Sequence, residues 1–411
     1  MLTNPLYDPF VILTKIYSDG ARLKQAIADT YIEEQNRART VKIVYGVLEN
    51  DGYFDFCIRF YAPKNPKLVV RTILKISLYM LLFMDKKRYM VTDLAVTLCK
   101  KLGKGGMSSF INAFLRRFDK TAVDSAMPLG DEGKTIAFSY PLYAYKKLKK
   151  EYGARADEIV KATSKGLSVR FEKNAEKYLQ KPHIQTPFEN NYIFEKFVRD
   201  DGFDDGDYTF QSVGSIAICD VVTPCENFLD ACSAPGGKSV LLSKKCGQIT
   251  AFELHEHRVE LIKQYQARMK VNNIMPLQKD SSVYDEKYKD AFDGVLCDVP
   301  CSGFGTVSEN PDVKLFRKET DFSSLNKAQS AILETCSKYV KKGGTLYYST
   351  CSLFEEENDT IVGAFLKNHP EFTAVETGSL LAHDKKKFGL QFLPDTAFGA
   401  GFYVCKMVKM Q

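Results

Sequence analysis

Apolar residues recur at intervals of three and four through the first third of the chain. They do so in four segments, at residues 27–48, 68–84, 91–102 and 110–118. This spacing puts the apolar side chains on one face of a helix, and turns rich in Gly, Asn and Asp separate the segments. Strand-like alternation is absent there. The pattern therefore predicts an all-α domain over residues 1–145.

Residues 146–210 have a mixed and more polar pattern. Short helices are predicted at residues 142–152 and 156–163, and the alternation of Leu167–Phe171 predicts a strand. Five carboxylates lie within residues 199–207, but without the ligand spacing or the closing Glu of a calcium loop. We therefore expect a small α+β segment whose acidic run is a solvated loop.

From residue 211 to the end, short apolar strands alternate with helical stretches. Strands are predicted at residues 227–230, 249–253, 292–298 and 344–349, with a further one before Asp280. Strands separated by such helices predict a mostly parallel, doubly wound α/β sheet, in which ligands bind beyond the carboxyl ends of the strands. The residues at those ends are able to do chemistry: Asp230, Glu253, Asp298 and the pair Thr350–Cys351.

Positive charge is concentrated in the helical region. The whole chain has 57 Lys and Arg against 51 Asp and Glu, a net charge of +6. Between Lys86 and Lys120, nine basic residues are accompanied only by Asp93 and Asp119. Such an excess suits a polyanion such as nucleic acid, and an ordinary solvated surface is the alternative.

The eleven cysteines form no Cys-x-x-Cys pair, and the longest apolar run, Ile76–Met84, has nine residues. A bilayer-spanning helix needs about 20 apolar residues, and the first residues do not resemble an export signal. We therefore expect a cytoplasmic protein with reduced thiols, no membrane partner and no metal site.

A glycine-rich turn follows the strand that ends at Asp230. Its two glycines, Gly236 and Gly237, let the backbone approach a ligand, and the start of the next helix offers free amides. The spacing matches neither a Walker loop nor G-x-G-x-x-G, so it does not predict phosphate binding. A purely structural strand-to-helix turn is the alternative.

Acidic residues at successive strand ends favour a nucleoside pocket beside this turn. Glu253 is placed where a carboxylate can bind both hydroxyls of a ribose. Asp280, at the end of the next strand, could accept a hydrogen bond from an exocyclic amine. A single acidic residue at such a place is commonly a cap or turn residue, but three in succession favour a nucleoside site.

Two cysteines follow neighbouring strands at the same edge. Cys301 lies in Asp-Val-Pro-Cys-Ser-Gly and Cys351 in Ser-Thr-Cys-Ser, both polar turns, whereas most cysteines are buried small apolar residues. A thiolate that adds to C6 of a cytosine activates C5 to attack a methyl sulfonium, and Asp298 could neutralise charge at N3. A second thiol could assist release of the adduct. The residues alone leave the order of the two cysteines open.

These motifs, followed by Glu355–Asn358, resemble those of the NOL1/NOP2/Sun family of RNA cytosine-5 methyltransferases, in particular its bacterial Sun/RsmB-type subgroup. The helical region resembles the NusB-type RNA-binding domain of that subgroup, and residues 146–210 resemble its small extension. The resemblance implies a Rossmann-like class I methyltransferase domain over residues 211–411, S-adenosylmethionine as cofactor, and small-subunit (16S) ribosomal RNA as substrate.

The resemblance also implies a role for each site residue. Cys351 would be the nucleophile, Cys301 would act in release, and Asp298 would lie between cofactor and base. Glu253 would bind the ribose and Asp280 the adenine. The methionine part would lie against Cys232, Ser233, Ala234, Pro235, Gly236, Gly237 and Lys238. Phosphate contacts would involve residues 310–314.

The chain departs from the family pattern at several positions. Glu253 stands where Asp is usual, Ser233 where Ala is usual, and Gln211-Ser212 where a Gln is followed by an acid. The loop Gly399–Tyr403 lacks the usual acidic residue, and the chain has no Trp, so base stacking must involve Phe or Tyr. A longer carboxylate at position 253 still reaches a diol, so we expect cofactor binding to be retained.

We therefore expect a monomeric methyltransferase that modifies C5 of a cytosine in 16S rRNA, at a base that is unpaired or flipped from its stack. One alternative is an RNA-binding protein of antitermination or ribosome assembly, whose methyltransferase domain has lost catalysis; the complete motif set disfavours it. The other is a DNA cytosine methyltransferase, in which the Pro-Cys thiol would attack and Ser-Thr-Cys-Ser would have no role.

Overall fold

The computed structural model describes residues 4–62 and 64–410, which form two compact units. The helical unit holds the described residues up to Lys147 together with Asn310–Phe316, and the mixed unit holds the rest. The division falls within one helix, α10 (Leu142–Tyr152). The middle and last segments of the sequence-based division, 146–210 and 211–411, lie almost entirely in the mixed unit.

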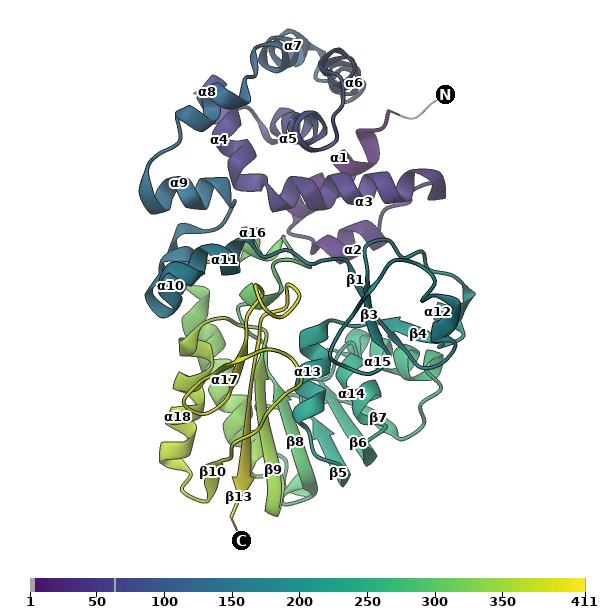
Figure 1. Ribbon diagram of the computed structural model, residues 1–411, viewed down its shortest axis with the longest axis vertical. Coiled ribbons are helices and arrows are strands. Elements are labelled where there is room, and N and C mark those ends of the chain that lie inside the picture. Colours follow the sequence, from purple (N-terminus) through teal and green to yellow (C-terminus); the bar gives the residue numbers. More distant parts are fainter. Residues whose placement is uncertain (1–3, 63, 411) are drawn as a thin grey trace. The chain divides into compact units, whose positions relative to one another are not determined.

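The described part of the helical unit contains no strand, as the periodicity predicts (Figure 1). Its helices are α1 (Tyr7–Asp19), α2 (Leu23–Ala28), α3 (Glu34–Glu49), α4 (Asp51–Tyr61), α5 (Leu68–Phe83), α6 (Arg88–Lys101), α7 (Ser108–Arg117), α8 (Lys120–Ser125), α9 (Gly130–Ala137) and α16 (Val313–Phe316). The segment expected as one helix over residues 27–48 is interrupted between α2 and α3. There Thr30 donates its hydroxyl to the carbonyl of Ala26, which competes with a continuing helix.

Helix α5 lies at the centre of the helical unit. It is buried on all sides from residue 72 to residue 80, because α1, α3, α4, α6 and α7 pack against it. Lys75 of α5 is 1% exposed, and its ammonium lies 2.7 Å from Asp51 and 3.1 Å from Asp55, both on α4. Tyr17 of α1 also donates to Asp51. This buried charge cluster fixes how α1, α4 and α5 pack.

A short segment from late in the chain completes the helical unit. Within Asn310–Phe316, Asp312 accepts a hydrogen bond from the N–H of Leu23 at 3.2 Å, and Lys314 donates to the carbonyl of Glu49 at 2.8 Å. Burial lowers the pKa of Lys314 to about 8. Asp312 and Lys314, which the family resemblance associates with phosphate, therefore have protein partners here.

The mixed unit contains a small antiparallel sheet in the order β2-β3-β1-β4. Its strands are β1 (Leu167–Phe171), β2 (Ile184–Gln185), β3 (Asn191–Phe194) and β4 (Tyr208–Phe210), and its helices are α11 (Ala156–Lys161) and α12 (Asp201–Asp204). The sequence predicts only β1, because the other strands are too short to show alternation. The acidic run over residues 199–207, expected as a loop, forms the short helix α12 in its middle and ends just before β4. The described residues contain no group of three or more potential metal ligands.

The larger sheet has the path β11-β12-β13-β9-β8-β5-β6-β7, with β10 on β13. Its strands are β5 (Cys225–Asp230), β6 (Cys246–Glu253), β7 (Ile274–Gln278), β8 (Phe292–Asp298), β9 (Val340–Thr350), β10 (Phe372–Ala374), β11 (Asp384–Lys385), β12 (Leu390–Phe392) and β13 (Phe402–Lys409). The five strands from β9 to β7 are parallel and the others antiparallel. The predicted parallel, Rossmann-like sheet is confirmed, and the antiparallel edge is an addition that the sequence does not predict.

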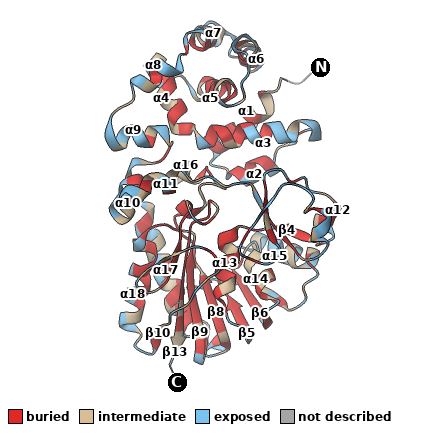
Figure 2. Cartoon of the chain, viewed as in Figure 1, coloured by how far each residue is buried: buried red, intermediate tan, exposed pale blue. Residues whose placement is uncertain are grey.

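Helices cover both faces of this sheet because apolar side chains alternate along its buried strands (Figures 1 and 2). One face packs against α13 (Val213–Val221), α14 (Gly237–Leu242) and α15 (Glu256–Arg268), and the other against α17 (Asp321–Ser337) and α18 (Asp359–Asn368). The first face presents Phe228, Ala251, Leu296 and Tyr347, and the second presents their neighbours Leu229, Phe252, Val295 and Tyr348. The strand order reverses between β5 and β8, and ligands bind at such a switch point.

Short 3-10 helices also occur in both units: η1 (Gly105–Met107), η2 (Gly153–Arg155), η3 (Ala175–Lys177), η4 (Glu286–Tyr288), η5 (Phe304–Thr306) and η6 (Glu355–Glu357). Among the residues that the structure describes, none of the helices has the length and apolar character needed to cross a bilayer.

We expect Lys75→Met to lower the stability of the helical unit by about 3 kcal/mol, because it leaves Asp51 buried without its cation. Hydrogen exchange of the α5 amides measures this. The control is Lys67→Met, a change of an exposed lysine just before α5 that we expect to cost less than about 0.5 kcal/mol. Equal protection of α5 in both variants would contradict the role of the buried cluster.

Candidate active site

The glycine-rich turn joins the end of β5 to the start of α14. Asp230, the last residue of β5, is buried and accepts a hydrogen bond from the Ser239 hydroxyl of α14 at 2.6 Å. Burial raises the pKa of Asp230 to about 6. Gly236 has φ +101°, and a Cβ there would lie 3.2 Å from Ile262 of α15. Backbone conformation and packing therefore both require a glycine at this point of the turn.

Glu253 is the last residue of β6 and Asp280 lies two residues beyond β7, along the same sheet edge as the turn. The buried carboxylate of Glu253 accepts from the N–H of His255 at 3.1 Å and from Arg258 at 3.3 Å. Arg258 also donates to the carbonyl of Ala234 at 3.1 Å and so connects Glu253 to the turn. Asp280 is exposed and accepts two hydrogen bonds from Ser282, which makes it a turn residue as well.

Asp298 connects the turn to the end of β9. One oxygen of this carboxylate accepts from the Lys238 ammonium at 2.7 Å, and the other accepts from the Ser349 hydroxyl at 2.7 Å. Burial by itself disfavours the charged form of Lys238, but the adjacent Asp298 outweighs that effect and raises the pKa of Lys238. Lys238 is therefore a permanent cation that orients Asp298.

The two cysteines predicted at neighbouring strand ends are in contact. The Sγ atoms of Cys301 and Cys351 are 3.0 Å apart, and the N–H of Cys351 donates to Cys301 Sγ at 3.2 Å. Cys301 is buried, whereas Cys351 is partly exposed. The hydrogen bond with Cys351, together with burial, raises the pKa of the Cys301 thiol well above its ordinary value. Cys301 therefore keeps its proton, and Cys351 is the more accessible sulfur.

A buried carboxylate joins the loops that carry these cysteines. Glu357 of η6 is 0% exposed and accepts hydrogen bonds from the N–H of Ser302, at 2.7 Å, and from the hydroxyl of Ser352. Gln329 of α17 donates to the same carboxylate at 3.0 Å. Glu357 belongs to the motif that the sequence marks, but its role depends on contacts between residues about 50 positions apart. Sequence reasoning therefore assigns it none.

Three further hydrogen bonds to backbone carbonyls fix the same loops. Arg317 donates to the carbonyl of Cys301 at 2.9 Å and to the carbonyl of Ser302 at 2.8 Å. The N–H of Gly401 donates to the carbonyl of Gly305, and a Cβ on Gly305 would lie only 1.9 Å from Gly401. The loop that lacks the usual acidic residue therefore supports the cysteine loops through its backbone.

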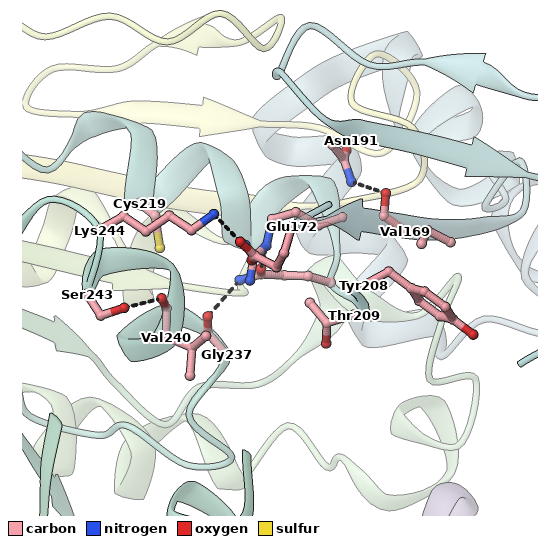
Figure 3. Close-up of polar contacts among 12 residues, drawn as sticks. Val169, Glu172, Asn191, Tyr208, Thr209, Cys219, Gly237, Val240, Ser243 and Lys244 are labelled. Atoms are coloured by element: carbon pink, nitrogen blue, oxygen red, sulfur yellow. Dashed lines mark hydrogen bonds and ion pairs between the residues drawn. The ribbon is translucent and has the colours of Figure 1, made fainter. Parts of the chain in front are cut away.

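A polar network behind the turn connects it to the small sheet. Gln211, just after β4, donates to the carbonyl of Gly237 at 3.1 Å and accepts from Arg170 of β1 at 2.8 Å. Arg170 is 3% exposed and pairs with Glu172, and Glu172 in turn pairs with Lys244, as Figure 3 shows for the second pair. The sequence predicts no role for Arg170, because this residue occupies a polar position in the alternation of β1, where a charged side chain is ordinarily exposed.

Comparison with known proteins identifies the family. A family model described as 16S rRNA methyltransferase RsmB/F matches residues 221–408, and a NusB family model matches residues 11–120. A probable ribosomal RNA small subunit methyltransferase B from Bacillus subtilis is 31% identical over 420 residues, which cover 94% of each chain. The chain belongs to the RsmB/F family of 16S rRNA methyltransferases.

Other relatives agree with this assignment. The ribosomal RNA small subunit methyltransferase B of Serratia proteamaculans is 27% identical over 402 residues, covering 92% of each chain. The crystal structure of PH0851 superposes with a TM-score of 0.82 at 21% identity and covers 99% of this chain and 98% of its own. NSun6 from Pyrococcus horikoshii, solved with SFG, gives 0.58 at 17% identity, over 66% of this chain and 99% of its own. These two structures share the fold.

This RsmB/F protein is therefore a methyltransferase of small-subunit ribosomal RNA, with S-adenosylmethionine as its methyl donor. The predictions of the family, of the fold and of this cofactor are confirmed. The site residues that the sequence places at strand ends do lie along one edge of the sheet, and the roles of the individual residues are taken up below as proposals.

We expect Gln211→Ala to weaken the binding of S-adenosylmethionine about tenfold, because it removes the donor that holds the Gly237 carbonyl and the acceptor of the buried Arg170 Nε. Isothermal titration calorimetry measures the Kd. Gln264→Ala, on the exposed side of α15, is the matched control. Unchanged affinity in Gln211→Ala would show that the turn does not depend on this contact.

Proposed function

We propose that this methyltransferase modifies C5 of a cytosine in 16S rRNA through a covalent bond between Cys351 and C6 of the base. The observation that carries the proposal is the contact between the Cys301 and Cys351 sulfur atoms, at the sheet edge that also carries the Lys238–Asp298 pair. One thiol to attack and a second to assist release are the groups that this chemistry requires.

The turn and the two strand-end carboxylates fit S-adenosylmethionine. Cys232–Lys238 would lie against the methionine part, Glu253 would bind the ribose hydroxyls, and Asp280 would accept from the adenine amine. The contacts of Glu253 with His255 and Arg258 both use Oε1, so Oε2 is the oxygen that would bind the diol. When bound, the cofactor supplies the sulfonium methyl group.

Cys351 would act as the attacking thiolate. Its side chain is the more exposed of the pair. The raised pKa of Cys301 keeps the Cys301 thiol protonated. Formation of the bond between Sγ and C6 gives C5 enamine character, so that C5 can take the methyl group. Asp298, oriented by Lys238 and Ser349, would act in its protonated form and donate that proton to N3, which neutralises the negative charge that develops on the ring.

Release requires loss of the C5 proton and cleavage of the bond between sulfur and C6. Cys301 lies in contact with the sulfur that must depart and retains a proton to donate to it. Donating that proton leaves a Cys301 thiolate, which would take the proton from C5 as the bond between Cys351 Sγ and C6 breaks. Glu357 holds both loops, so the two sulfur atoms would remain close through both halves of the reaction. Cys301 would therefore act in release rather than in attack.

The same observations disfavour the two alternatives. In a DNA cytosine methyltransferase the Pro-Cys thiol would attack, yet here Cys301 is the buried member of the pair. A protein that only bound RNA would have no need of two thiols in contact beside a charged Lys238–Asp298 pair.

We expect Cys351→Ala to abolish methylation of 16S rRNA, by a factor of at least about 1,000, because no other thiol can form the bond to C6. Cys301→Ala should instead accumulate a protein–RNA adduct that survives denaturing electrophoresis. Bisulfite sequencing of 16S rRNA locates the product, and RNA from a deletion strain is the unmethylated substrate.

Cys225→Ala is the matched control, since Cys225 is also partly exposed but lies at the start of β5, at the end away from the glycine-rich turn. Full turnover by Cys351→Ala, or a methyl group at an atom other than C5, would defeat the proposed mechanism.

A further inference from the structure

We propose that a basic groove between α6 and α7 of the helical unit binds the phosphate backbone and one base of a single-stranded rRNA segment. This inference rests on the proposed function, which gives rRNA as the substrate. It goes further by naming the surface of the helical unit that would bind the rRNA. Both helices pack against each other and expose much of their outer surface (Figure 2).

The groove consists of two adjoining cavities. The first, of about 750 Å³, lies between α6 and α7 and is lined by Tyr89 and Asn112 among others. The second, of about 590 Å³, includes Lys86, Arg117 and Lys120. Arg88 and Arg116 line both cavities, so the two cavities adjoin at these two arginines. Its size admits several nucleotides of an extended strand.

The groove carries a net positive charge. Five basic residues line the two cavities, against the carboxylates of Asp93 and Asp119. Asp119 is engaged as the N-cap of α8, where it accepts from the N–H of Thr121 at 2.9 Å. Lys120 pairs with Asp124, so the positive excess rests on Lys86, Arg88, Arg116 and Arg117. The remaining excess favours a chain of phosphates over a neutral or cationic ligand.

Arg88 is fixed in the position where a phosphate would bind. Its Nη1 atom donates to the carbonyls of Leu115 and Phe118, at 2.5 and 2.8 Å, at the end of α7. Both bonds use Nη1, so Nε and Nη2 are the nitrogens that would bind a phosphate. A guanidinium held in this way loses little entropy on binding, and its fork matches the geometry of a phosphate.

Tyr89 provides a surface on which a base could stack. Its side chain is 73% exposed beside the first cavity, where the side chains of Asn112 and Ser109 offer hydrogen bonds to a base edge. Stacking of this kind needs an unpaired base, and the chain has no Trp that could serve instead. An aromatic side chain beside fixed cations is the combination that favours a single strand over a duplex.

The charge of the groove is tested by Arg116→Glu combined with Arg117→Glu. The control, Lys24→Glu with Lys64→Glu, changes the same net charge at exposed lysines elsewhere in the helical unit. We expect the Kd for a fluorescent oligocytidylate of about 15 nucleotides to rise at least tenfold in the first variant only. The slope of log Kd against log salt should fall by about 0.7 for each lost phosphate contact.

Base stacking is tested by Tyr89→Ala, with Tyr31→Ala as its control because Tyr31 is 89% exposed. We expect a loss of about fivefold or more in affinity for Tyr89→Ala, with the salt slope unchanged. Equal affinities of the Arg and Lys double variants would overturn the proposal that the groove binds RNA. Equal affinities of the two Tyr variants would overturn the proposal that a base stacks on Tyr89.

Kinetics with 16S rRNA separate this inference from the proposed function. The Arg116/Arg117 variant should show a raised KM for rRNA, an unchanged kcat and an unchanged Kd for S-adenosylmethionine. An unchanged KM together with normal C5 methylation would reject the proposed RNA-binding groove and leave the proposed function in place. A raised KM with methylation at another atom would reject the proposed chemistry and leave the groove in place.

Discussion

The fully buried carboxylate of Glu357 is the contact on which the site depends. A charge without water is costly unless several donors surround it, and here Ser302, Ser352 and Gln329 supply them. Because two of these donors follow Cys301 and Cys351 directly, the carboxylate fixes both cysteine loops at once. The close approach of the two sulfur atoms is a consequence of this arrangement.

A half-buried ion pair supports the cofactor side of the same edge. The pair Lys238–Asp298 spans from α14 to β8, and Ser349 extends it to β9, so three elements around the switch point share one polar network. Arg170 and Gln211 support the start of α14 from the opposite side. The turn is therefore positioned from both sides before a ligand arrives, which reduces the entropy lost on binding.

Local patterns predict the parallel strands and their reactive ends, because a buried strand shows itself as a short apolar run and its last residue follows directly in sequence. That reasoning identifies Asp230, Glu253 and Asp298 as strand-end residues. It also predicts that the two cysteines lie near each other. The roles of Glu357 and Arg170 depend on contacts between distant segments that no local pattern records. For the same reason the sequence does not indicate that Asn310–Phe316 belongs to the helical unit. The residues alone leave the order of the two cysteines open, and the unequal burial of Cys301 and Cys351 supports the proposed order.

The proposed chemistry also places a demand on the helical unit. Attack at C6 requires a base that has left its stack, and unstacking costs a few kcal/mol that must be recovered by binding elsewhere on the RNA. Two thiols and one carboxylate offer little binding surface for that purpose, whereas Arg88, Arg116 and Tyr89 offer phosphate and stacking contacts. Phosphate contacts weaken steeply with salt, but formation of a bond between sulfur and carbon does not. High ionic strength should therefore weaken rRNA binding and leave the rate of the chemical step unchanged, because different groups of residues carry out binding and chemistry.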